Sequence, residues 1–262
     1  MSEWHELADL NLIAVIKSRM QAIPNASFAE RDGIASFSIG RPYLDGHLNG
    51  IFSCATNAAP QRILELGDHF TKSHGFDFIY WIRDHADRDL EMALRGRGLL
   101  PKREPGSAGM IIDHSIILPK LSIDYSVSRV STQNDVDDFA RVVATSFSYP
   151  VEIAKLAIGP QAQLTKQNVH AFLVRSNGAA VAGGMVIVEH DVAGLYYIAT
   201  VPEARGRGLG ELCTALACNA GIELSARAVI LQASLLGERL YQRLGFRTIT
   251  HYRWYGRAQL PV

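Results

Sequence analysis

An apolar strand that leads into a helix ending in arginine, glycine and a large apolar residue occurs twice in this sequence. The first copy reads DFIYWI (77–82) followed by ALRGRGLL (93–100), and the second reads AVILQAS (228–234) followed by YQRLGF (241–246). Repetition of a whole unit restricts a fold more than any single motif does. We therefore predict two copies of one α+β unit, with chance recurrence of strand, helix and glycine as the alternative.

The spacing of apolar residues predicts a similar order of elements in both halves. In the first half we expect a helix that ends at Pro24, a hairpin of strands 33–40 and 50–56, a helix over 60–73, a strand over 77–82, a helix over 88–98 and a strand over 109–118. In the second half we expect a strand over 125–130, a helix capped by Ser131 or Thr132, strands over 171–176, 180–190 and 195–201, a helix over 209–224, a strand over 228–234, a helix over 235–244 and a strand over 248–255. Pro119 marks the boundary, which gives domains 1–119 and 120–262.

Composition limits the partners of this chain. Lys and Arg number 26, as do Asp and Glu, so the net charge of zero gives no support for nucleic-acid binding. No apolar run approaches the ~18 residues of a membrane span, and the acidic start does not fit a signal peptide. We expect a cytoplasmic monomer or homodimer with no membrane attachment. Cys54, Cys213 and Cys218 lack metal-ligand spacing, so we expect buried free thiols and no metal site.

A β-rich run, a loop of arginine and glycine, and a helix follow one another in YYIATVPEARGRGLGELCTALACNAG. Backbone N–H groups at the start of such a helix point to one place, where the helix dipole also favours an anion. Gly206, Gly208 and Gly210 would let a phosphate approach the main chain without a Cβ in the way. Arg205 and Arg207 add positive charge. The glycine spacing fits neither the dinucleotide fingerprint nor a P-loop.

Two motifs in this half resemble those of one family. The loop from Arg205 to Gly210 matches the Arg/Gln-x-x-Gly-x-Gly/Ala signature of the GNAT N-acetyltransferase superfamily, with Val201-Pro202-Glu203 as the usual lead-in. Downstream, YQRLGF resembles the family's Tyr-x-x-x-Gly-Phe. The resemblance covers residues 125–255 and implies an α+β unit with a mixed, mainly antiparallel sheet flanked by helices. Together with the repeat, it implies a tandem form with two GNAT-like units.

The resemblance implies transfer of an acetyl group from acetyl-CoA, the cosubstrate, to a primary amine that attacks the thioester directly. In this family the main chain of one strand binds the pantetheine, and here that strand carries Ile198, Ala199, Thr200 and Val201. The pyrophosphate is held by the loop that here comprises Arg205, Gly206, Arg207, Gly208, Leu209 and Gly210. A backbone N–H between Ala199 and Val201 would stabilise the developing oxyanion.

Tyr241 takes the place of the family's general acid, which protonates the departing thiolate. The alternative is that Tyr241 only borders the core, as tyrosines beside leucines in a helix commonly do. Ser234, at the end of the neighbouring strand, is a candidate ligand for the pantetheine or the thiol. Its alternative role is a helix N-cap before Leu235.

The general base and the acceptor are not identified by the sequence. Glu189, His190 and Asp191 stand together between two strands and could deprotonate an amine through water, but such a triplet is also an ordinary hairpin turn. Phe147 and Tyr149 follow the first helix of the second half, where GNAT proteins often shape the acceptor pocket. They fit a hydrophobic core equally well.

The first half lacks the chemical features of the second. Its counterpart of the phosphate loop, residues 55–62, has no glycine and places Pro60 where a donor N–H would be needed. Its counterpart of Tyr241 is Met92 or Leu94, and neither side chain can donate a proton. The Arg-Gly-Arg-Gly run at 95–98 ends a helix, where the dipole is negative. We interpret the first half as a degenerate repeat retained for packing and for shaping the acceptor cleft.

We therefore predict that residues 120–262 form an acetyl-CoA-dependent N-acetyltransferase that acts on a small-molecule amine. Two alternatives stay open. One is acetylation of a protein N-terminus or lysine, and the other is a non-catalytic acyl-CoA sensor that regulates a partner.

Overall fold

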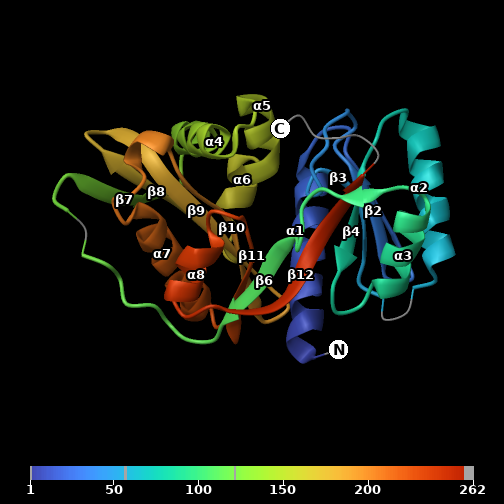
Figure 1. Ribbon diagram of the computed structural model, residues 1–262. Helices are drawn as coiled ribbons and strands as arrows, with labels where there is room; N and C mark the ends of the chain where they lie inside the picture. Colours follow the sequence, from blue (N-terminus) through green and yellow to red (C-terminus); the bar gives the residue numbers. More distant parts are fainter. Residues whose placement is uncertain (1, 56–57, 121, 257–262) are drawn as a thin grey trace. The chain divides into compact units, whose positions relative to one another are not determined.

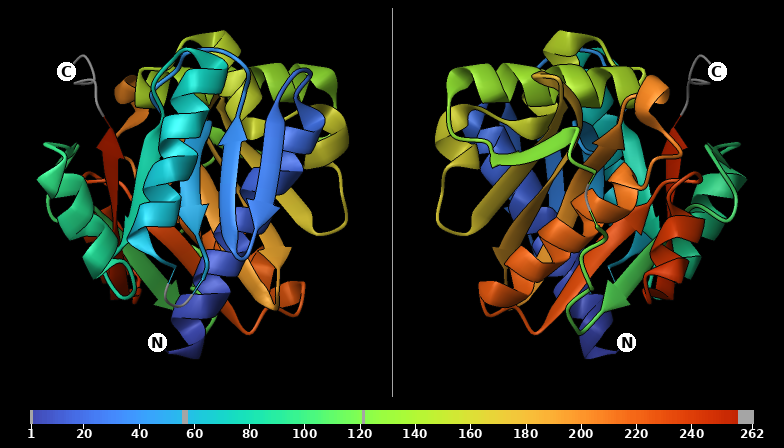
Figure 2. Two further views of the ribbon diagram at one scale, coloured as in Figure 1. Left: turned by 90° about the vertical axis from the view of Figure 1, so that its right-hand side faces the viewer. Right: turned by 90° about the vertical axis from the view of Figure 1, so that its left-hand side faces the viewer.

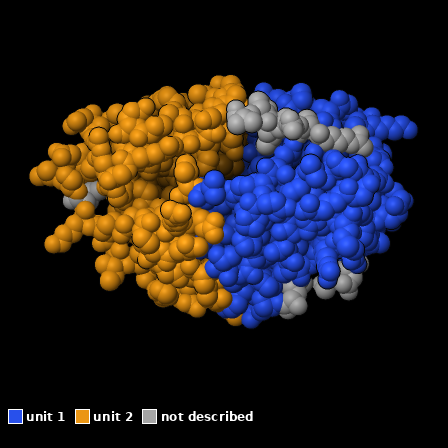
Figure 3. Space-filling model, in the orientation of Figure 1, with its two compact units in different colours: residues 1–110, 232–235, 248–262 blue, residues 111–231, 236–247 orange. Residues whose placement is uncertain are grey.

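The computed structural model describes residues 2–55, 58–120 and 122–256, and the chain divides into two compact units (Figures 1 and 3). Unit 1 consists of Met1–Met110, Gln232–Leu235 and Thr248–Val262, and unit 2 of Ile111–Leu231 and Leu236–Arg247. The chain therefore does not divide into its compact units at residue 119 alone, because the last strand of the chain belongs to unit 1. The limits 1–119 and 120–262 remain a prediction about functional domains.

Unit 1 contains a mixed sheet in the order β1-β2-β3-β4-β12. Its strands are β1 (Ser27–Arg31), β2 (Ile34–Ser38), β3 (Asn49–Ser53), β4 (Ile79–Arg83), β12 (Arg247–Gly256) and the short β5 (Leu100–Pro101), which pairs with β12. Neighbouring strands are antiparallel except β3 and β4, which helix α2 (Pro60–His74) connects as a parallel pair.

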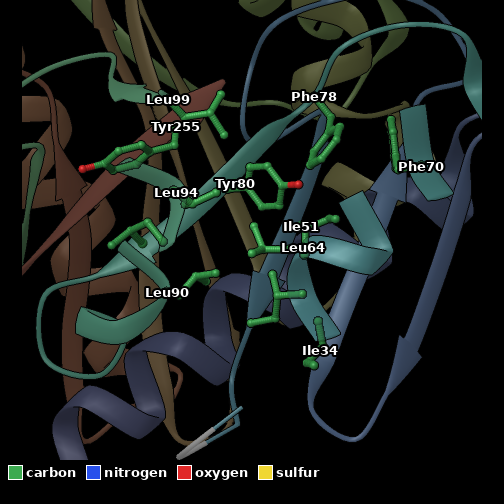
Figure 4. Packing of buried hydrophobic residues seen from close by; sticks show 12 residues of the cluster. Ile34, Ile51, Leu64, Phe70, Phe78, Tyr80, Leu90, Leu94, Leu99 and Tyr255 are labelled. Atoms are coloured by element: carbon green, nitrogen blue, oxygen red, sulfur yellow. The ribbon is translucent and has the colours of Figure 1, made fainter. Parts of the chain in front are cut away.

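Helices cover both faces of the unit 1 sheet, and Figure 2 (left) shows α2 on one side of the strands and α1 (Glu3–Ala22) on the other. Two side chains of β12 that point to opposite faces illustrate this. The Tyr252 hydroxyl donates to Asp9 of α1 at 2.8 Å, whereas Tyr255 packs with Leu94 of α3 (Arg88–Gly96). The core between the sheet and helices α2 and α3 is shown in Figure 4 and includes Ile34, Ile51, Leu64, Phe70, Phe78 and Tyr80.

Unit 2 contains the strand order β11-β10-β9-β8-β7. These strands are β7 (Tyr125–Arg129), β8 (Val169–Ser176), β9 (Ala179–Glu189), β10 (Val192–Thr200) and β11 (Ala228–Ala233). All pairs are antiparallel except β10 and β11, which helix α7 (Leu209–Glu223) connects as a parallel pair. Antiparallel strands followed by one helical crossover thus occur in both units, which confirms the prediction of two mixed, mainly antiparallel α+β units.

Helices α4 (Gln133–Phe147) and α7 lie on opposite faces of the unit 2 strands (Figure 1). A Cβ atom at Gly183 of β9 would lie 3.1 Å from Phe139 of α4. On the other face, a Cβ at Gly221 of α7 would lie 2.5 Å from Ala193 of β10. Glycine at these positions therefore allows close packing of both helices on the sheet. Shorter helices complete the unit: α5 (Val151–Ile158), α6 (Gln161–Leu164), the 3-10 turn η1 (Pro202–Ala204) and α8 (Glu238–Arg243).

Several predicted elements differ from the observed ones. Strand β1 and helices α5 and α6 were not expected, and helix α8 is shorter than the predicted 235–244. The strand predicted over 109–118 is observed as β6 (Ser107–Ile112). Beyond it, the side chain of Asn219 accepts from the Ile116 N–H and donates to the Ile116 carbonyl, both at 2.8 Å. These bonds satisfy the backbone without a strand partner, so the β-forming sequence does not extend the strand.

The three cysteines are free thiols, with Cys213 and Cys218 buried and Cys54 partly exposed. Burial raises the pKa of the Cys213 thiol to about 12. The prediction of free thiols is confirmed, and full burial holds for two of the three.

Candidate active site

Strands β10 and β11 run side by side for part of their length and then separate. Their parallel register covers Val192 to Gly194 of β10, opposite Ala228 to Ile230 of β11. Among the described residues no further pair joins these strands, although β10 continues to Thr200 and β11 to Ala233. The second half of β10 is therefore left with an open edge.

A β-bulge interrupts β10 where the open edge begins. The register with β9 shifts between Tyr196 and Ala199, and Tyr197 has a positive φ of 52°. A bulge bends its strand and re-aims the main-chain groups next to it. Tyr197 is a site feature that the sequence analysis missed, and its only signal was the Tyr-Tyr pair before the glycine loop.

Main-chain hydrogen bonds at the end of β10 show which groups face the open edge. The Val201 N–H donates to the Val181 carbonyl at 3.0 Å, and the Val201 carbonyl accepts from the Ala204 N–H. Because antiparallel pairs alternate between bonded and non-bonded positions, the main-chain groups of Thr200 point away from β9. Of the N–H groups predicted to stabilise an oxyanion, that of Val201 is already bonded, whereas that of Thr200 faces the open edge.

The glycine loop lies directly after this strand and leads into α7. Gly206 and Gly208 have φ values of 75° and 78°, and a Cβ at either position would meet no atom within 4 Å. Gly208 is the N-cap of α7, whose first N–H groups have no partner within the helix. A 15-residue helix whose N-terminus opens onto uncrowded glycines has the chemistry of a phosphate site.

The two arginines of the loop have different partners. The Arg205 side chain donates from Nε to the Thr200 carbonyl at 3.2 Å and from Nη2 to the Ser146 carbonyl at 3.3 Å. Arg207 is exposed, and its Nη1 lies 3.4 Å from the Tyr125 hydroxyl. Gly210 has a packing role, because a Cβ there would lie 3.3 Å from Leu240 of α8.

Tyr241 lies in α8 with 8% of its surface exposed. Its ring meets that of Phe246 edge-on, with the ring centroids 5.7 Å apart. Burial raises the pKa of Tyr241 above its usual range, and the nearby Cys213 thiol raises it further. The phenol therefore stays protonated at neutral pH, as a general acid requires.

The glycine of the second motif ends α8. Gly245 has a φ of 96°, the Phe246 N–H donates to the Tyr241 carbonyl at 3.0 Å, and the Gly245 N–H donates to the Gln242 carbonyl at 3.1 Å. This is a Schellman C-cap, for which glycine is the usual residue. The Tyr-x-x-x-Gly-Phe spacing therefore fixes both the end of the helix and the packing of Phe246 on Tyr241.

Ser234 is exposed and belongs to unit 1, whereas the other predicted site residues belong to unit 2. The N-cap alternative is wrong, because α8 begins at Glu238 and its N-cap is Gly237. The role of Ser234 as a ligand remains a prediction.

The triplet considered as a general base forms the turn between β9 and β10. His190 and Asp191 have φ values of 52° and 63°, the left-handed pair of a type I′ hairpin. Glu189 accepts from Asn168 at 2.9 Å. The turn precedes the first residue of β10, whereas the glycine loop follows the last, so roughly 25 Å of strand separates them. The structure supports the hairpin-turn alternative.

Three aromatic rings gather beside the bulge. Phe147, at the end of α4, stacks on Tyr149 with a centroid separation of 5.9 Å and meets Tyr197 edge-on at 6.3 Å. All three are partly exposed. The structure therefore brings the two predicted aromatic residues next to the open edge of β10, and neither is fully buried in the core.

The region of unit 1 that corresponds to the open edge between β10 and β11 is filled by the side chain of an arginine. Strands β3 and β4 pair at Gly50 with Ile79, as β10 and β11 pair at Gly194 with Ile230. Four residues beyond each isoleucine stand Arg83 and Ser234 respectively (79 to 83, 230 to 234).

The Arg83 guanidinium is 1% exposed and binds two carboxylates and one carbonyl. It donates to Asp87 at 2.8 and 2.9 Å, to Asp9 at 2.8 Å and to the Ala55 carbonyl at 2.9 Å. A buried arginine with four side-chain hydrogen bonds thus occupies the position beside the end of β3, and this supports the interpretation of unit 1 as degenerate.

The other residues of unit 1 that were predicted as counterparts of the site residues have the following positions. In the counterpart loop, Thr56 and Asn57 lie outside the described residues, and Pro60 is the first residue of α2. Met92 is 58% exposed and Leu94 is fully buried. The 95–98 run lies at the end of α3, as predicted, and its arginines pair with the carboxylates of Glu104 and Asp68.

Within the described residues no group of three His, Cys, Asp or Glu side chains is arranged to hold a metal ion. No helix in the same part of the chain is long and apolar enough to cross a membrane.

Comparisons with known proteins agree with this geometry. Residues 167–248 match the family model of an acetyltransferase (GNAT) domain. A GCN5-related N-acetyltransferase from Kribbella flavida is 15% identical, with a TM-score of 0.71 over 95% of both chains. A tandem GNAT protein from the clavulanic acid biosynthesis pathway is 11% identical, with a TM-score of 0.65 over 98% of this chain and 94% of that one. A GCN5-related N-acetyltransferase from Sphaerobacter thermophilus is 14% identical, with a TM-score of 0.64 over 90% and 76%. The sequence has no significant match among curated proteins.

Residues 167–248, most of which lie in unit 2, therefore resemble a GNAT acetyltransferase domain. The chain as a whole has the fold of a tandem GNAT protein.

Proposed function

We propose that this protein is an acetyl-CoA-dependent N-acetyltransferase that acetylates a primary amine on a small molecule, with the reaction carried out by unit 2. The observation that supports this most is the separation of β10 from β11 beside the glycine loop at the start of α7. An extended chain with amide groups can pair with the open strand edge, and its phosphates can then reach the N-terminus of the helix.

The residues at the open edge of β10 and at the start of α7 both fit the cosubstrate. The open edge offers the Thr200 N–H, and the loop offers N–H groups beside Gly206 and Gly208, where a Cβ would meet open space. Leu209, which is 3% exposed, anchors the start of α7 in the core and so fixes the end of the loop. Arg207 supplies an exposed positive charge.

Acetyl-CoA supplies the acetyl group as a thioester. The Thr200 N–H is the oxyanion donor we propose, because it points to the open edge while that of Val201 is engaged. The amine nitrogen forms a bond to the carbonyl carbon, and as the bond between that carbon and sulfur then breaks, Tyr241 gives its phenolic proton to the departing sulfur. The amine loses its own proton to solvent or to a base that we do not assign.

Two observations support a small-molecule acceptor. The rings of Phe147, Tyr149 and Tyr197 offer apolar contact beside the bulge. The structural relative of the clavulanic acid pathway belongs to the biosynthesis of a small molecule. We extend the small-molecule class to this chain on these grounds.

Purified protein tested with acetyl-CoA and a panel of amines distinguishes the candidates. Thiol release that depends on a small amine, with a mass increase of that amine by one acetyl group, is the expected result. Acetylation of peptides alone would favour a protein acetyltransferase. Tight acetyl-CoA binding without turnover on any amine would favour a sensor, and absence of binding would contradict the proposal.

A further inference from the structure

Arg205 joins two elements of unit 2 that lie far apart in the sequence. Its Nε donates to the carbonyl of Thr200 at the end of β10, and its Nη2 donates to the carbonyl of Ser146 in the last turn of α4. A planar guanidinium donates to two carbonyls from different nitrogens in fixed directions, whereas an ammonium donates from a single nitrogen. The first residue of the glycine-loop signature is thus occupied by main-chain partners.

The end of α4 needs such a partner. The last four carbonyls of a helix have no N–H donor within it, and the helix dipole favours a cation there. Helix α4 has no basic residue in its own last turn. Arg205, contributed by the loop after β10, supplies that positive charge.

Phe147 and Tyr149 follow closely after Ser146, and together with Tyr197 they form a wall of three aromatic rings, called the aromatic wall below. Ser148 ends the helix with a φ of 57°, and the Tyr149 N–H donates back to the Ala144 carbonyl at 2.9 Å. Phe147 contacts Tyr197 of the bulge. The position of this wall relative to the strand edge therefore depends on the end of α4, which Arg205 holds.

Arg207 provides a contrast two residues away. Both arginines are exposed, but Arg207 contacts one side chain, the Tyr125 hydroxyl at 3.4 Å, whereas Arg205 bonds two main-chain carbonyls. The Arg207 guanidinium can turn toward an anion without breaking a bond to the main chain.

We infer that Arg205 is a positioning residue that clamps the end of β10 to the C-terminus of α4. Arg207 is then the arginine of this loop that attracts the phosphates of acetyl-CoA. This inference rests on the proposed function only where it concerns acetyl-CoA. The clamp itself is a property of the free protein and can be measured without any ligand.

The ligand-free arm uses hydrogen exchange of the peptide that covers residues 143–149. In Arg205→Gln we expect exchange of this peptide to become about two- to fivefold faster, because the end of α4 loses both a positive charge and a guanidinium hydrogen bond. In Arg207→Gln we expect no change. Arg205→Lys keeps the charge but donates from a single nitrogen, so it should restore only part of the slow exchange. Parent-like exchange in Arg205→Gln, or full recovery in Arg205→Lys, would overturn the clamp.

The second arm measures CoA binding by calorimetry at about 50 mM and about 300 mM salt, because screening weakens exposed charge pairs. Arg207→Gln should bind CoA more weakly and with less salt dependence than the parent. Arg205→Gln should keep the salt dependence of the parent. The opposite pattern would make Arg205 the phosphate ligand and overturn the inference. A parent protein that binds no CoA would refute the proposed function, but the result of the hydrogen-exchange experiment would still hold.

Discussion

The phenol of Tyr241 has two possible roles, in packing and in proton transfer, and one hydroxyl separates them. Tyr241→Phe keeps the ring against Phe246, so we expect CoA affinity to be unchanged. If the phenol is the acid, turnover should fall by about 10²- to 10⁴-fold. The same substitution in unit 1, Tyr255→Phe, removes a hydroxyl that donates to Glu91 and should leave turnover near that of the parent. Equal turnover in both variants, with chemistry limiting the rate, would assign Tyr241 to packing.

Gly208 combines a special backbone conformation with open space. Gly208→Ala should destabilise the protein by about 1–2 kcal/mol because its φ is 78°, and it should also weaken CoA binding because the new Cβ stands where an anion would approach. Gly178 in the β8–β9 turn has a φ of 82°, and a Cβ there would also meet no atom within 4 Å, so Gly178→Ala carries the same strain away from the loop. Calorimetry showing equal CoA affinity in the two variants would contradict the phosphate-loop assignment.

At the scale of elements, helix α4 begins at an N-cap formed by Thr132, one of the two caps that the sequence predicts, and Asp135 completes a capping box. The Asp135 N–H donates to Thr132 Oγ1 at 3.2 Å, and the Asp135 carboxylate accepts from the Thr132 N–H at 3.0 Å. Arg175 of β8 donates to the same carboxylate at 2.9 Å. Burial acts to raise the pKa of Asp135, but the bonds from Thr132, Ser131 and Arg175 outweigh it and lower the pKa to about 2.

The lowered pKa of Asp135 gives a stability prediction with a defined sign. The ordinary pKa of aspartate in an unfolded chain is about 3.9. The carboxylate therefore contributes its full stabilisation above about pH 4, and the contribution is lost as the pH falls toward about 2. Urea unfolding should show Asp135→Asn less stable than the parent at pH 7, with the difference shrinking below pH 4. A difference that does not change with pH would contradict this. Asp137→Asn in the same helix is the control.

At the scale of the whole molecule, the number of cosubstrate sites distinguishes one active unit from two. We expect one CoA per chain, because a buried Arg83 occupies in unit 1 the position that an open strand edge occupies in unit 2. Titration of the full chain with acetyl-CoA should give a stoichiometry near one. A stoichiometry near two would restore the first half as an active unit.

The division of the chain into units also predicts the result of truncation. Strand β12 pairs with β4 from Tyr252, opposite Arg83, to Tyr255, opposite Tyr80. A fragment of residues 121–262 would keep β12 and lose β4, which exposes tyrosines that are 1% and 0% exposed in the full chain. We expect this fragment to be insoluble or inactive. A soluble fragment with full activity would show that the second half folds independently.

The sequence alone determined the features that depend on residues close together along the chain. The glycine loop, the capped start of α4 and the Tyr241 to Phe246 motif are local patterns, because turns, caps and amphipathic helices are set within a few residues. Strand β1 was missed although Asp32-Gly33 gives the signal of a two-residue hairpin turn, since its exposed residues show no apolar alternation.

Only the tertiary structure decided which residues meet across long distances in the chain. Arg83 and Asp9 lie 74 positions apart, and no local pattern links them. The same is true of Arg205 and Ser146, 59 positions apart, and of the last strand, which belongs to unit 1 although it follows the acetyltransferase motifs. A buried charge needs a partner, but the sequence does not say which one, because the pairing depends on how strands and helices pack. The glycine loop that we propose as the phosphate site could therefore be recognised from the sequence, whereas the open strand edge beside it and the filled position in the other unit came from the fold.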